Sequence, residues 1–307
     1  MVLHKNESIA VHGGHRLGDT LLALVFAHNL IENGYKVTFF STILDELKPL
    51  FPKITLDSSL PPWSAQKEKE MPHPKLAPFN LILFPASSHF LVHKNPEQEK
   101  KLWDRGPKVF YERISLPTVF QNVCKTIFCL DNTFRTNGMI PPKGAQAKKF
   151  PRRVVIHPTS SDLRKNWQKK KFFQLAEALK KKGFEPYFTL ASYERKDWEN
   201  STIPLVPKGN MLELAHFIYE SGYFIGNDSG IGHLASNLGL PTLTFCPRKT
   251  QGKRWGPAWS ESELLYPWLH LPGPRLKLYF WKHFISVKTA LKGFDKILIQ
   301  SPTSEII

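Results

Sequence analysis

The stretch that decides the fold is YFIGNDSGIGHLASNLGLPTLTF, residues 223–245. An apolar run ends at Asn227 and Asp228, a turn rich in glycine and a helical pattern of small residues follow, and a second apolar run closes the stretch. Nearly continuous apolar strands that alternate with helices are typical of a parallel sheet with both faces covered. The stretch therefore predicts a strand–helix–strand motif of an α/β domain, with a polar turn after its first strand.

The same alternation occurs twice along the 307 residues, on either side of a proline-, glycine- and lysine-rich stretch at 137–152. Before this stretch, strands are predicted at 8–12, 35–41, 79–85 and 107–111, helices at 20–34 and 116–130, and loops with short helices at 58–78. After it, strands are predicted at 153–158, 185–192, 223–227 and 241–247, and helices at 169–183, 210–222, 231–239 and 279–299. We therefore expect two Rossmann-like, doubly wound α/β domains, at residues 1–148 and 149–307, that face a central cleft.

The composition favours a globular protein, because hydrophobic residues make up 41% and charged residues 22% of the chain. No stretch reaches the roughly 18 uninterrupted apolar residues of a membrane helix, and the first residues lack the apolar core of a signal peptide. We therefore expect a cytoplasmic location. Cys124, Cys129 and Cys246 show neither a metal-binding spacing nor a secreted disulfide pattern, so no metal site is predicted.

The net charge of +16 indicates anionic partners. Nucleic acid, an acidic membrane surface and phosphorylated small molecules all carry negative charge. The basic residues are spread along the chain, and no zinc finger, basic zipper or RNA-recognition signature is present in the sequence. We therefore expect no nucleic-acid partner.

Doubly wound sheets bind ligands beyond the carboxyl ends of their strands, so the turns after the strands hold the candidate site residues. Asp228 ends a predicted strand, and Ser229, Gly230 and Gly232 precede the next helix. Glycines let the backbone approach a ligand, and a helix N-terminus presents N–H groups that suit a phosphate. A carboxylate repels phosphate, so Asp228 suits the hydroxyls of a sugar. The alternative is that Asp228 or Ser229 only caps the helix.

Two further turns of the second half carry polar side chains. Thr159, Ser160 and Lys165 follow the strand at 153–158, and two hydroxyls with an ammonium suit a diphosphate. Glu194 follows the strand at 185–192, where an acidic residue binds the ribose in dinucleotide-binding folds. The structural alternatives are an exposed polar loop for the first set and a surface glutamate for the second.

Asp19 lies after Gly18 in the first strand-to-helix turn of the first half. It is either the cap of the following helix or a general base. A helix N-terminus stabilises the ionised carboxylate and so weakens it as a base. A carboxylate that takes a proton as a bond forms still contributes about 10²–10⁴-fold to a rate.

Four stretches together resemble the lipopolysaccharide heptosyltransferases of glycosyltransferase family 9. They are LGDTLLALVFAHNL (17–30), VVIHPTSSDLRKNWQKKKFFQLAEAL (154–179), TLASYERKDW (189–198) and NDSGIGHLASNLGLPTLTFCP (227–247). The last is the most specific, because it is similar to the family's Asp-Ser/Thr-Gly-x-x-His-Leu-Ala segment. The resemblance spans most of the chain and implies the two-domain GT-B fold.

The resemblance also implies an activity: inverting, metal-independent transfer of heptose from ADP-heptose to the lipopolysaccharide inner core, with no cofactor besides this donor. The acceptor would be an anionic Kdo–lipid A or heptosylated core, reached by peripheral contact with the inner face of the cytoplasmic membrane. Asp19 would deprotonate the acceptor hydroxyl. The implied donor contacts are Thr159, Ser160 and Lys165 with the diphosphate, Glu194 with the ribose, Gly209 and Asn210 near the adenine, Asp228 with heptose hydroxyls, and Ser229, Gly230 and His233 with the phosphates.

Two alternatives remain open at the level of the sequence. The chain is either a GT-B transferase that uses a different nucleotide sugar or acceptor, or a catalytically silent protein that binds a sugar nucleotide. The sequence also departs from the family pattern, because Phe245-Cys246-Pro247 stands where the family usually has Phe-Gly-Pro. The basic residues 248–254, RKTQGKR, follow this departure and are interpreted as a loop.

Overall fold

The computed structural model describes residues 4–61, 73–85, 90–94, 100–103, 114–199, 202–268 and 279–300. It divides into two compact units, Met1–Ile140 and Pro141–Ile307, called here the N-terminal unit and the C-terminal unit. The division falls within the proline- and glycine-rich stretch at 137–152. The predicted strand at 107–111 and residues 62–72 of the 58–78 segment lie outside the described residues.

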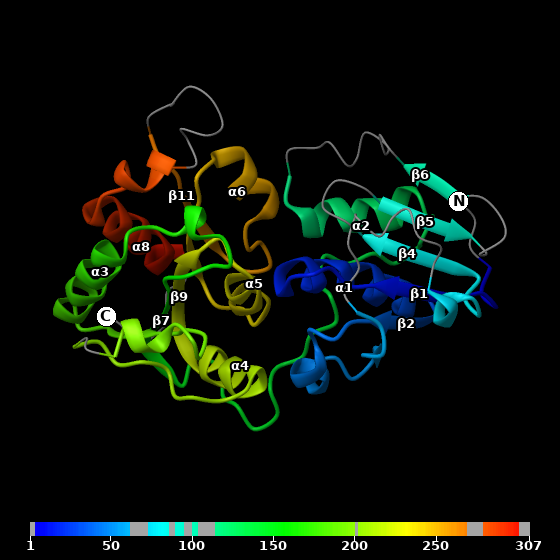
Figure 1. The fold of residues 1–307 in the computed structure, drawn as a ribbon, viewed down its shortest axis with the longest axis horizontal. Helices are drawn as coiled ribbons and strands as arrows, with labels where there is room; N and C mark the ends of the chain where they lie inside the picture. Colours follow the sequence, from blue (N-terminus) through cyan, green and yellow to red (C-terminus); the bar gives the residue numbers. More distant parts are fainter. Residues whose placement is uncertain are drawn as a thin grey trace. The chain divides into compact units, whose positions relative to one another are not determined.

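The N-terminal unit contains a six-stranded sheet with the order β3-β2-β1-β4-β5-β6 (Figure 1). Its strands are β1 (Ser8–His12), β2 (Lys36–Phe40), β3 (Thr55–Asp57), β4 (Leu81–Pro85), β5 (Phe90–Lys94) and β6 (Lys100–Trp103). The first four strands in chain order are parallel, whereas β5 and β6 extend the sheet in antiparallel fashion. The sequence predicted β1, β2 and β4 but missed β3 and this antiparallel extension.

Helix α1 (Leu17–Glu32) follows β1 and is buried along most of its length. It contacts β1, β2 and α2 (Leu116–Thr126), and the Phe26 and Phe120 rings lie 4.6 Å apart. The helix is followed by Gly34, whose φ of +82° lies in the left-handed region that favours glycine. The predicted helix and its glycine terminus are therefore confirmed.

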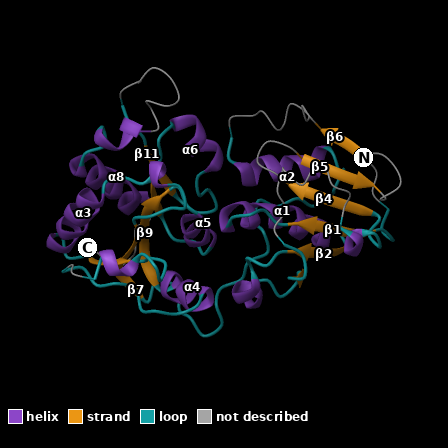
Figure 2. Ribbon diagram, viewed as in Figure 1, coloured by secondary structure: helices purple, strands orange, loops and turns teal. Residues whose placement is uncertain are grey.

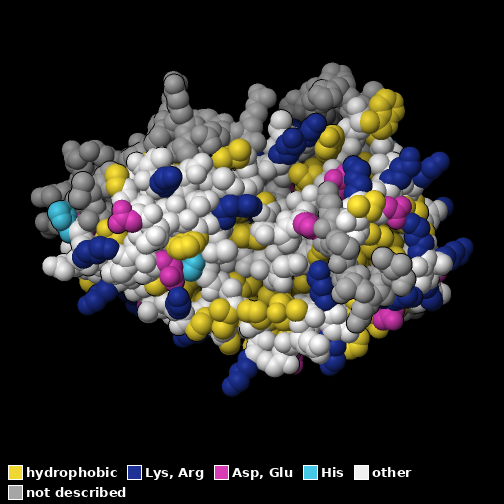
Figure 3. Space-filling view, turned by 180° about the vertical axis from the view of Figure 1, so that it is seen from behind, with side chains coloured by type: hydrophobic (Ala, Val, Ile, Leu, Met, Phe, Trp, Pro, Cys, Tyr) yellow, Lys and Arg dark blue, Asp and Glu magenta, His cyan; other side chains and the backbone are white. Residues whose placement is uncertain are grey.

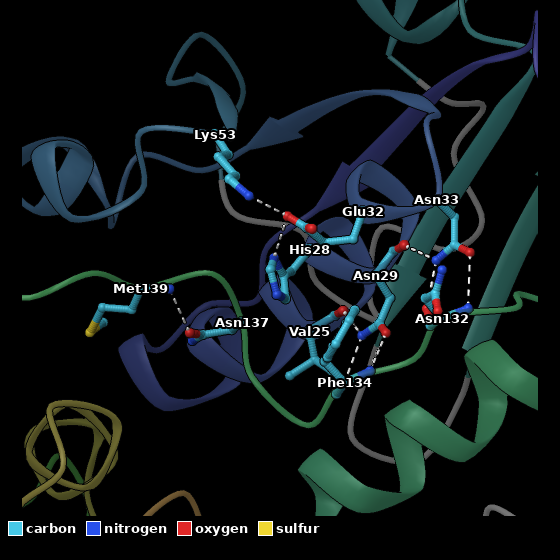
Figure 4. A network of polar contacts seen from close by, with 10 residues as sticks. All are labelled: Val25, His28, Asn29, Glu32, Asn33, Lys53, Asn132, Phe134, Asn137 and Met139. Carbon is cyan, nitrogen blue, oxygen red and sulfur yellow. Dashed lines mark hydrogen bonds and ion pairs between the residues drawn. The ribbon is translucent and has the colours of Figure 1, made fainter.

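A polar network ties the segment before the unit boundary to α1 (Figure 4). The buried Asn29 side chain donates to the Phe134 carbonyl at 2.9 Å and accepts from the Phe134 N–H at 2.6 Å. Asn33 exchanges the same two kinds of hydrogen bond with the backbone of Asn132. Asn137 donates to an α1 carbonyl at 3.0 Å. Hydrogen bonds made by side-chain amides, rather than by a helix or strand, therefore hold this segment against α1.

The C-terminal unit contains a five-stranded, entirely parallel sheet with the order β11-β10-β9-β7-β8. Its strands are β7 (Phe150–His157), β8 (Glu185–Phe188), β9 (Ser221–Asn227), β10 (Thr242–Phe245) and β11 (Ser262–Leu265). The helices are η5 (Leu163–Lys165), α3 (Lys169–Lys181), η6 (Arg195–Asp197), α4 (Met211–Tyr219), α5 (Gly230–Asn237), α6 (Lys249–Trp255), η7 (Trp281–His283) and α8 (Val287–Gln300). Figure 2 shows helices on both sides of these strands, as the doubly wound pattern predicted.

The main core of the C-terminal unit lies between the sheet and helices α3 and α8, and α4 and α5 pack together on the other face. Phe172 and Leu175 of α3 and Phe294 of α8 are fully buried. Trp167 is 2% exposed, stacks on Phe245 with ring centroids 4.3 Å apart, and donates its ring N–H to a backbone carbonyl. The loop before α3 is therefore fastened to the core at its end.

Two elements of the C-terminal unit were not predicted. The residues 248–254 were interpreted as a loop, but Lys249–Trp255 form helix α6. A Cβ added to Gly252 would lie 2.5 Å from Sγ of Cys246, so α6 packs on Cys246 too closely for a larger residue. The helix has no apolar periodicity, which is why the sequence pattern missed it. Strand β11 was missed because half of its four residues are polar.

Candidate functional site

The C-terminal sheet has a switch point between β7 and β9, because the chain adds β8 on one side of β7 and β9 on the other. Loops part at such a point and leave room for a ligand at the carboxyl ends of the strands. Strand β7 ends at His157 and β9 ends at Asn227. The candidate residues that follow these two strands therefore start from neighbouring strand ends.

Asn227 was not among the predicted site residues, yet its side chain joins the loop after β7 to the end of β9. Its side chain is 1% exposed. The Oδ1 atom accepts from the Trp167 N–H at 2.9 Å, and Nδ2 donates to the Pro158 carbonyl at 2.7 Å. Pro158 and Trp167 are the two ends of the loop that carries the predicted diphosphate ligands. One buried amide thus fixes both ends of this loop beside the end of β9.

Lys165 and Asp228, which lie 63 residues apart in the chain, form an ion pair. The Lys165 Nζ donates to Oδ2 of Asp228 at 3.0 Å, and the two side chains are 20% and 8% exposed. The backbone N–H of Asp228 donates to the Phe245 carbonyl at 3.1 Å, which ties this residue to β10. The pair thereby holds an ammonium group next to the residues that begin α5.

Thr159 and Glu194, predicted as phosphate and ribose ligands, are also brought together. The Thr159 hydroxyl donates to Oε2 of Glu194 at 3.0 Å, and the same oxygen accepts from the Ala191 N–H at 3.0 Å. Ser160 donates to Oδ1 of Asn166 at 2.7 Å, within its own loop. A diol ligand and a phosphate ligand that lie side by side suit a nucleotide, in which ribose and phosphate are adjacent.

The start of α5 carries hydrogen-bonding capacity that the protein itself leaves unused. The buried Ser229 hydroxyl and Nδ1 of His233 have no hydrogen-bond partner among the described residues. Burial lowers the pKa of His233, although the Asp228 carboxylate opposes this shift. The imidazole is therefore held neutral near pH 7. Together with the first N–H groups of α5, which lack intrahelical acceptors, these groups suit a phosphate.

Gly209 and Asn210 lie at the start of α4, where Asn210 and Glu213 form a capping box. The Asn210 side chain accepts from the Glu213 N–H at 2.9 Å, and Oε2 of Glu213 accepts from the Asn210 N–H at 2.8 Å. A Cβ added to Gly209 would lie 2.4 Å from Oε2 of Glu213. These contacts account for both residue types without a ligand, and the contact with adenine stays a prediction.

Asp19 lies in the N-terminal unit, in the first turn of α1, and its side chain is half-buried. The turn that precedes it packs directly on it, because a Cβ added to Gly14 would lie 2.8 Å from Cβ of Asp19. The Thr20 hydroxyl donates to the Gly14 carbonyl at 3.1 Å and closes this turn. The glycine-rich turn after β1 is thus built around Asp19, whose role as a base stays a prediction.

A cavity of about 300 Å³ borders the loop that Asn227 holds. Its lining includes Thr159 and Asn166 of the loop, Lys169 of α3, Trp198 and Lys282. The Lys169 Nζ lies 4.9 Å from the centroid of the Trp198 ring. The cavity therefore extends the candidate site from Thr159 toward the start of α3 with an aromatic and cationic surface.

Positive charge is distributed widely rather than gathered in one stripe on the face shown in Figure 3, where Lys and Arg side chains stand over many elements. Within the described parts of the chain, no group of three or more His, Cys, Asp or Glu is placed to hold a metal ion. Among the helices that the structure describes, none has the length and apolar content needed to cross a membrane.

The C-terminal part of the chain matches a known family. The family model of glycosyltransferase family 9 (heptosyltransferase) matches residues 139–266, which contain the turns after β7, β8 and β9. This match confirms the family resemblance that the sequence motifs indicated. No curated protein matches the chain.

The whole chain is similar in fold to solved glycosyltransferases. A family 9 glycosyl transferase from Veillonella parvula matches with a TM-score of 0.69 and 15% identity, over 97% of this chain and 99% of that one. ADP-heptose lps heptosyltransferase II of E. coli matches with a TM-score of 0.61 and 12% identity, over 96% and 99%. Heptosyltransferase WaaC of E. coli, solved with ADP, matches with a TM-score of 0.61 and 9% identity, over 94% and 99%. The α/β fold of the GT-B heptosyltransferases, which the sequence predicted, is therefore confirmed.

Proposed function

Because residues 139–266 carry a glycosyltransferase family 9 (heptosyltransferase) domain, we propose that this protein transfers heptose from ADP-heptose to the inner core of lipopolysaccharide. The acceptor is Kdo–lipid A or an already heptosylated core. Support comes from two proteins of similar fold, one an ADP-heptose lps heptosyltransferase and the other a heptosyltransferase solved with ADP. We place the reaction in the cytoplasm, with peripheral contact at the inner face of the cytoplasmic membrane.

The donor binds, in this proposal, at the carboxyl ends of β7, β8 and β9. Glu194 takes the ribose hydroxyls, with Gly209 and Asn210 near the adenine. Thr159, Ser160 and Lys165 contact the diphosphate, and Asp228 contacts the hydroxyls of the heptose. Ser229, Gly230 and His233 complete the phosphate site. The proposal rests mainly on the two hydrogen bonds of the Asn227 side chain, with the Trp167 N–H and the Pro158 carbonyl, which fasten the loop of Lys165 to the end of β9. We call these two bonds the Asn227 clamp.

The reaction we propose is a single displacement with inversion. The acceptor oxygen forms a bond to the anomeric carbon of heptose as the bond from that carbon to the β-phosphate oxygen breaks, and ADP leaves. Asp19 takes the proton of the acceptor hydroxyl. The negative charge that develops on the diphosphate is stabilised by Lys165, the Ser229 hydroxyl and the N–H groups at the start of α5. These groups supply the stabilisation that a divalent cation gives in metal-dependent transferases, so the transfer is metal-independent.

The test is a reaction of the full chain with ADP-heptose and a Kdo–lipid A acceptor that lacks heptose. We expect mass spectrometry to find the acceptor with one added heptose, and an equal amount of released ADP. ADP release without an extended acceptor contradicts the transfer. Turnover with a different nucleotide sugar but not with ADP-heptose would show that the other nucleotide sugar is the donor. Tight ADP binding without any turnover makes the protein a silent nucleotide-sugar binder.

The diphosphate role of Lys165 is tested separately by calorimetry with ADP. We expect Lys165→Ala to weaken ADP binding by about tenfold or more, because a charge-assisted hydrogen bond is lost. Lys170→Ala is the matched control, since Lys170 is an exposed lysine in the first turn of α3 and takes no part in the proposed site. Equal ADP affinity of both variants contradicts the assignment.

A further inference from the structure

The loop of Lys165 is held from a second side by residues 281–285, which lie just before the last helix. These residues are η7 and the two positions that follow it. They lie beyond residues 139–266, which the family model matches, and include none of the predicted site residues. Trp281 and Ile285 are fully buried in the main core of the C-terminal unit. Residues 281–285 are therefore a firm part of that core, and we call them the 281–285 segment.

Two indole N–H groups join the 281–285 segment to the loop on either side of Lys165. The Trp281 Nε1 donates to the Arg164 carbonyl at 2.9 Å, one residue before Lys165. The Trp167 Nε1 donates to the Ile285 carbonyl at 3.1 Å, two residues after Lys165. Contacts with the same segment therefore fix the chain both before and after Lys165.

The 281–285 segment is itself fixed by Lys171 of α3. The Lys171 Nζ donates to the carbonyls of Lys282 at 2.9 Å, His283 at 3.2 Å and Ile285 at 2.8 Å. An ammonium group has three N–H donors, so these three carbonyls use its full donor capacity. Lys171 therefore holds the segment in place and is not available to a ligand.

The Trp281 bond acts at a part of the loop that the Asn227 clamp does not reach. The clamp fixes the two ends of the loop, whereas Lys165 lies between them in the short helix η5. This helix is a single turn, in which the Lys165 N–H donates to the Asp162 carbonyl at 2.8 Å. One 3₁₀ turn has poor hydrogen-bond geometry and little stability of its own. The bond from Trp281 to the Arg164 carbonyl therefore supports the turn at the position next to Lys165.

We propose that Trp281 is a positioning residue for Lys165: its indole N–H, acting through the Arg164 carbonyl, holds the lysine where it meets the donor diphosphate. The Lys165 side chain leaves the supported turn and reaches Asp228 at 3.0 Å. A lysine side chain loses conformational freedom when it binds a phosphate, and a backbone that is already fixed adds no further ordering cost. The inference rests on the proposed function, which makes Lys165 a diphosphate ligand.

The test is calorimetry with ADP on the full chain and on Trp281→Phe, which keeps an aromatic ring but removes the indole N–H. We expect ADP affinity to fall by about fivefold, because a buried carbonyl loses its donor and the turn of Lys165 loses its support. Phe294→Leu is the matched control, since Phe294 is fully buried in the same core and packs on the rings of Phe184 and Tyr223. This control should lose stability but keep its ADP affinity.

A double-mutant cycle separates positioning from a general loosening of the core. In the Lys165→Ala background, Trp281→Phe should leave ADP affinity unchanged, because the side chain that it positions is missing. The salt dependence of ADP affinity should also be shallower in Trp281→Phe than in the parent, as it should be in Lys165→Ala, because an ammonium–phosphate contact is weakened. A purely structural role of Trp281 changes neither quantity in this way.

Lys171→Met is a second variant, which loosens the 281–285 segment without changing an indole ring. It should lower ADP affinity as well, and again only while Lys165 is present. Lys170→Met is its matched control, because Lys170 is the exposed neighbour of Lys171 in α3. If circular dichroism shows that Trp281→Phe is not folded, this pair of variants decides the question.

Hydrogen exchange measured without ADP follows the loop directly. Backbone N–H groups of residues 160–166 should exchange about fivefold faster in Trp281→Phe than in the parent, because the turn opens more often. The proposal is overturned by unchanged exchange, by unchanged ADP affinity in folded Trp281→Phe, or by an equal loss of affinity with and without Lys165. A parent chain that does not bind ADP contradicts both the positioning role and the proposed function. ADP binding without heptose transfer contradicts the proposed function alone.

Discussion

At the scale of single residues, Asn227 shows how a position given by the sequence pattern acquires a structural role in the candidate site. Its position at the end of a buried strand follows from the apolar pattern, and its type follows from the two bonds it makes. One carboxamide supplies an acceptor for the Trp167 N–H and a donor for the Pro158 carbonyl. Neither an acid nor an aliphatic residue supplies both. This one side chain therefore links both ends of the loop that carries Lys165 to the end of β9.

We expect Asn227→Ala to destabilise the protein by about 1–3 kcal/mol, because it leaves buried backbone groups without partners. It should also weaken ADP binding, since both ends of the loop lose a hydrogen bond to the end of β9. Thermal denaturation and calorimetry measure the two effects. Asn29→Ala is the control, because it removes a buried amide of the N-terminal unit. That variant should lose stability but keep its ADP affinity. Unchanged ADP affinity in folded Asn227→Ala would contradict the role of the clamp.

Asp19→Asn tests the proposed base at the same scale. The amide cannot accept the proton, so we expect the transfer rate to fall by about 10²–10⁴-fold while the affinity for ADP-heptose changes little. Single-turnover kinetics and calorimetry separate the two quantities. Glu32→Gln, at the other end of α1, should leave both unchanged. A normal transfer rate in Asp19→Asn removes the assignment.

At the scale of elements, the capping hydrogen bonds at a helix N-terminus distinguish a candidate residue with a structural role from one whose side chain is available to a ligand. Asn210 and Glu213 cap α4 reciprocally, which satisfies two N–H groups of its first turn. Ser229 stands at the same position of α5, but its side chain makes no capping hydrogen bond. Of the two helix starts, α4 is thus complete without a ligand, whereas α5 leaves its cap hydroxyl available.

The two roles of Asn210 are separable by substitution. Asn210→Ala removes the cap and should lower the free energy of unfolding by about 0.5–2 kcal/mol. Asn210→Ser keeps a good cap, so its stability should stay close to that of the parent. If Asn210 also lies near the adenine, ADP affinity falls in both variants, because neither retains the carboxamide. Urea denaturation and calorimetry with ADP give the two readings, and full ADP affinity in both variants leaves the residue with a capping role alone.

At the scale of the whole molecule, buried histidines couple stability to pH. Burial lowers the pKa of His157 and His233 below the value of 6.5 that is typical of an exposed histidine. Their partners only partly oppose this effect, namely a hydrogen bond with the Thr189 carbonyl for His157 and the Asp228 carboxylate for His233. Between the lowered pKa and 6.5, the unfolded chain binds a proton that the folded chain does not. Stability therefore decreases as the pH falls below about 6.5.

We expect the free energy of unfolding to fall by up to about 1.4 kcal/mol per pH unit for each such histidine below pH 6.5. Urea denaturation of the full chain at a series of pH values measures this slope. His233→Gln should reduce the slope. A flat stability profile below pH 6.5 would contradict the effect of burial.

The elements were largely predictable because they depend on local pattern. The helix expected at 20–34 is α1 (Leu17–Glu32), and the strand expected at 223–227 is β9 (Ser221–Asn227). Helix α6 was not predictable, since its residues are mostly basic and it is held by close packing of Gly252 on Cys246. The antiparallel pair β5 and β6 was missed as well, because the alternation of strands and helices predicts only parallel neighbours.

The sequence by itself determined which segments are buried, where β7 and β9 end to within one residue, and which polar side chains stand after those ends. These properties follow from the spacing of apolar residues and from the conformational preferences of glycine, serine and asparagine. The end of β8 was predicted at residue 192 but lies at Phe188. Only the tertiary structure decided which strand ends are neighbours. The order β9-β7-β8 brings Lys165 to Asp228 across 63 residues and Thr159 to Glu194 across 35 residues. Hydrophobic periodicity does not encode that order, because every apolar strand offers its neighbours the same backbone hydrogen bonds, and the choice among them depends on how the helices pack on the completed sheet.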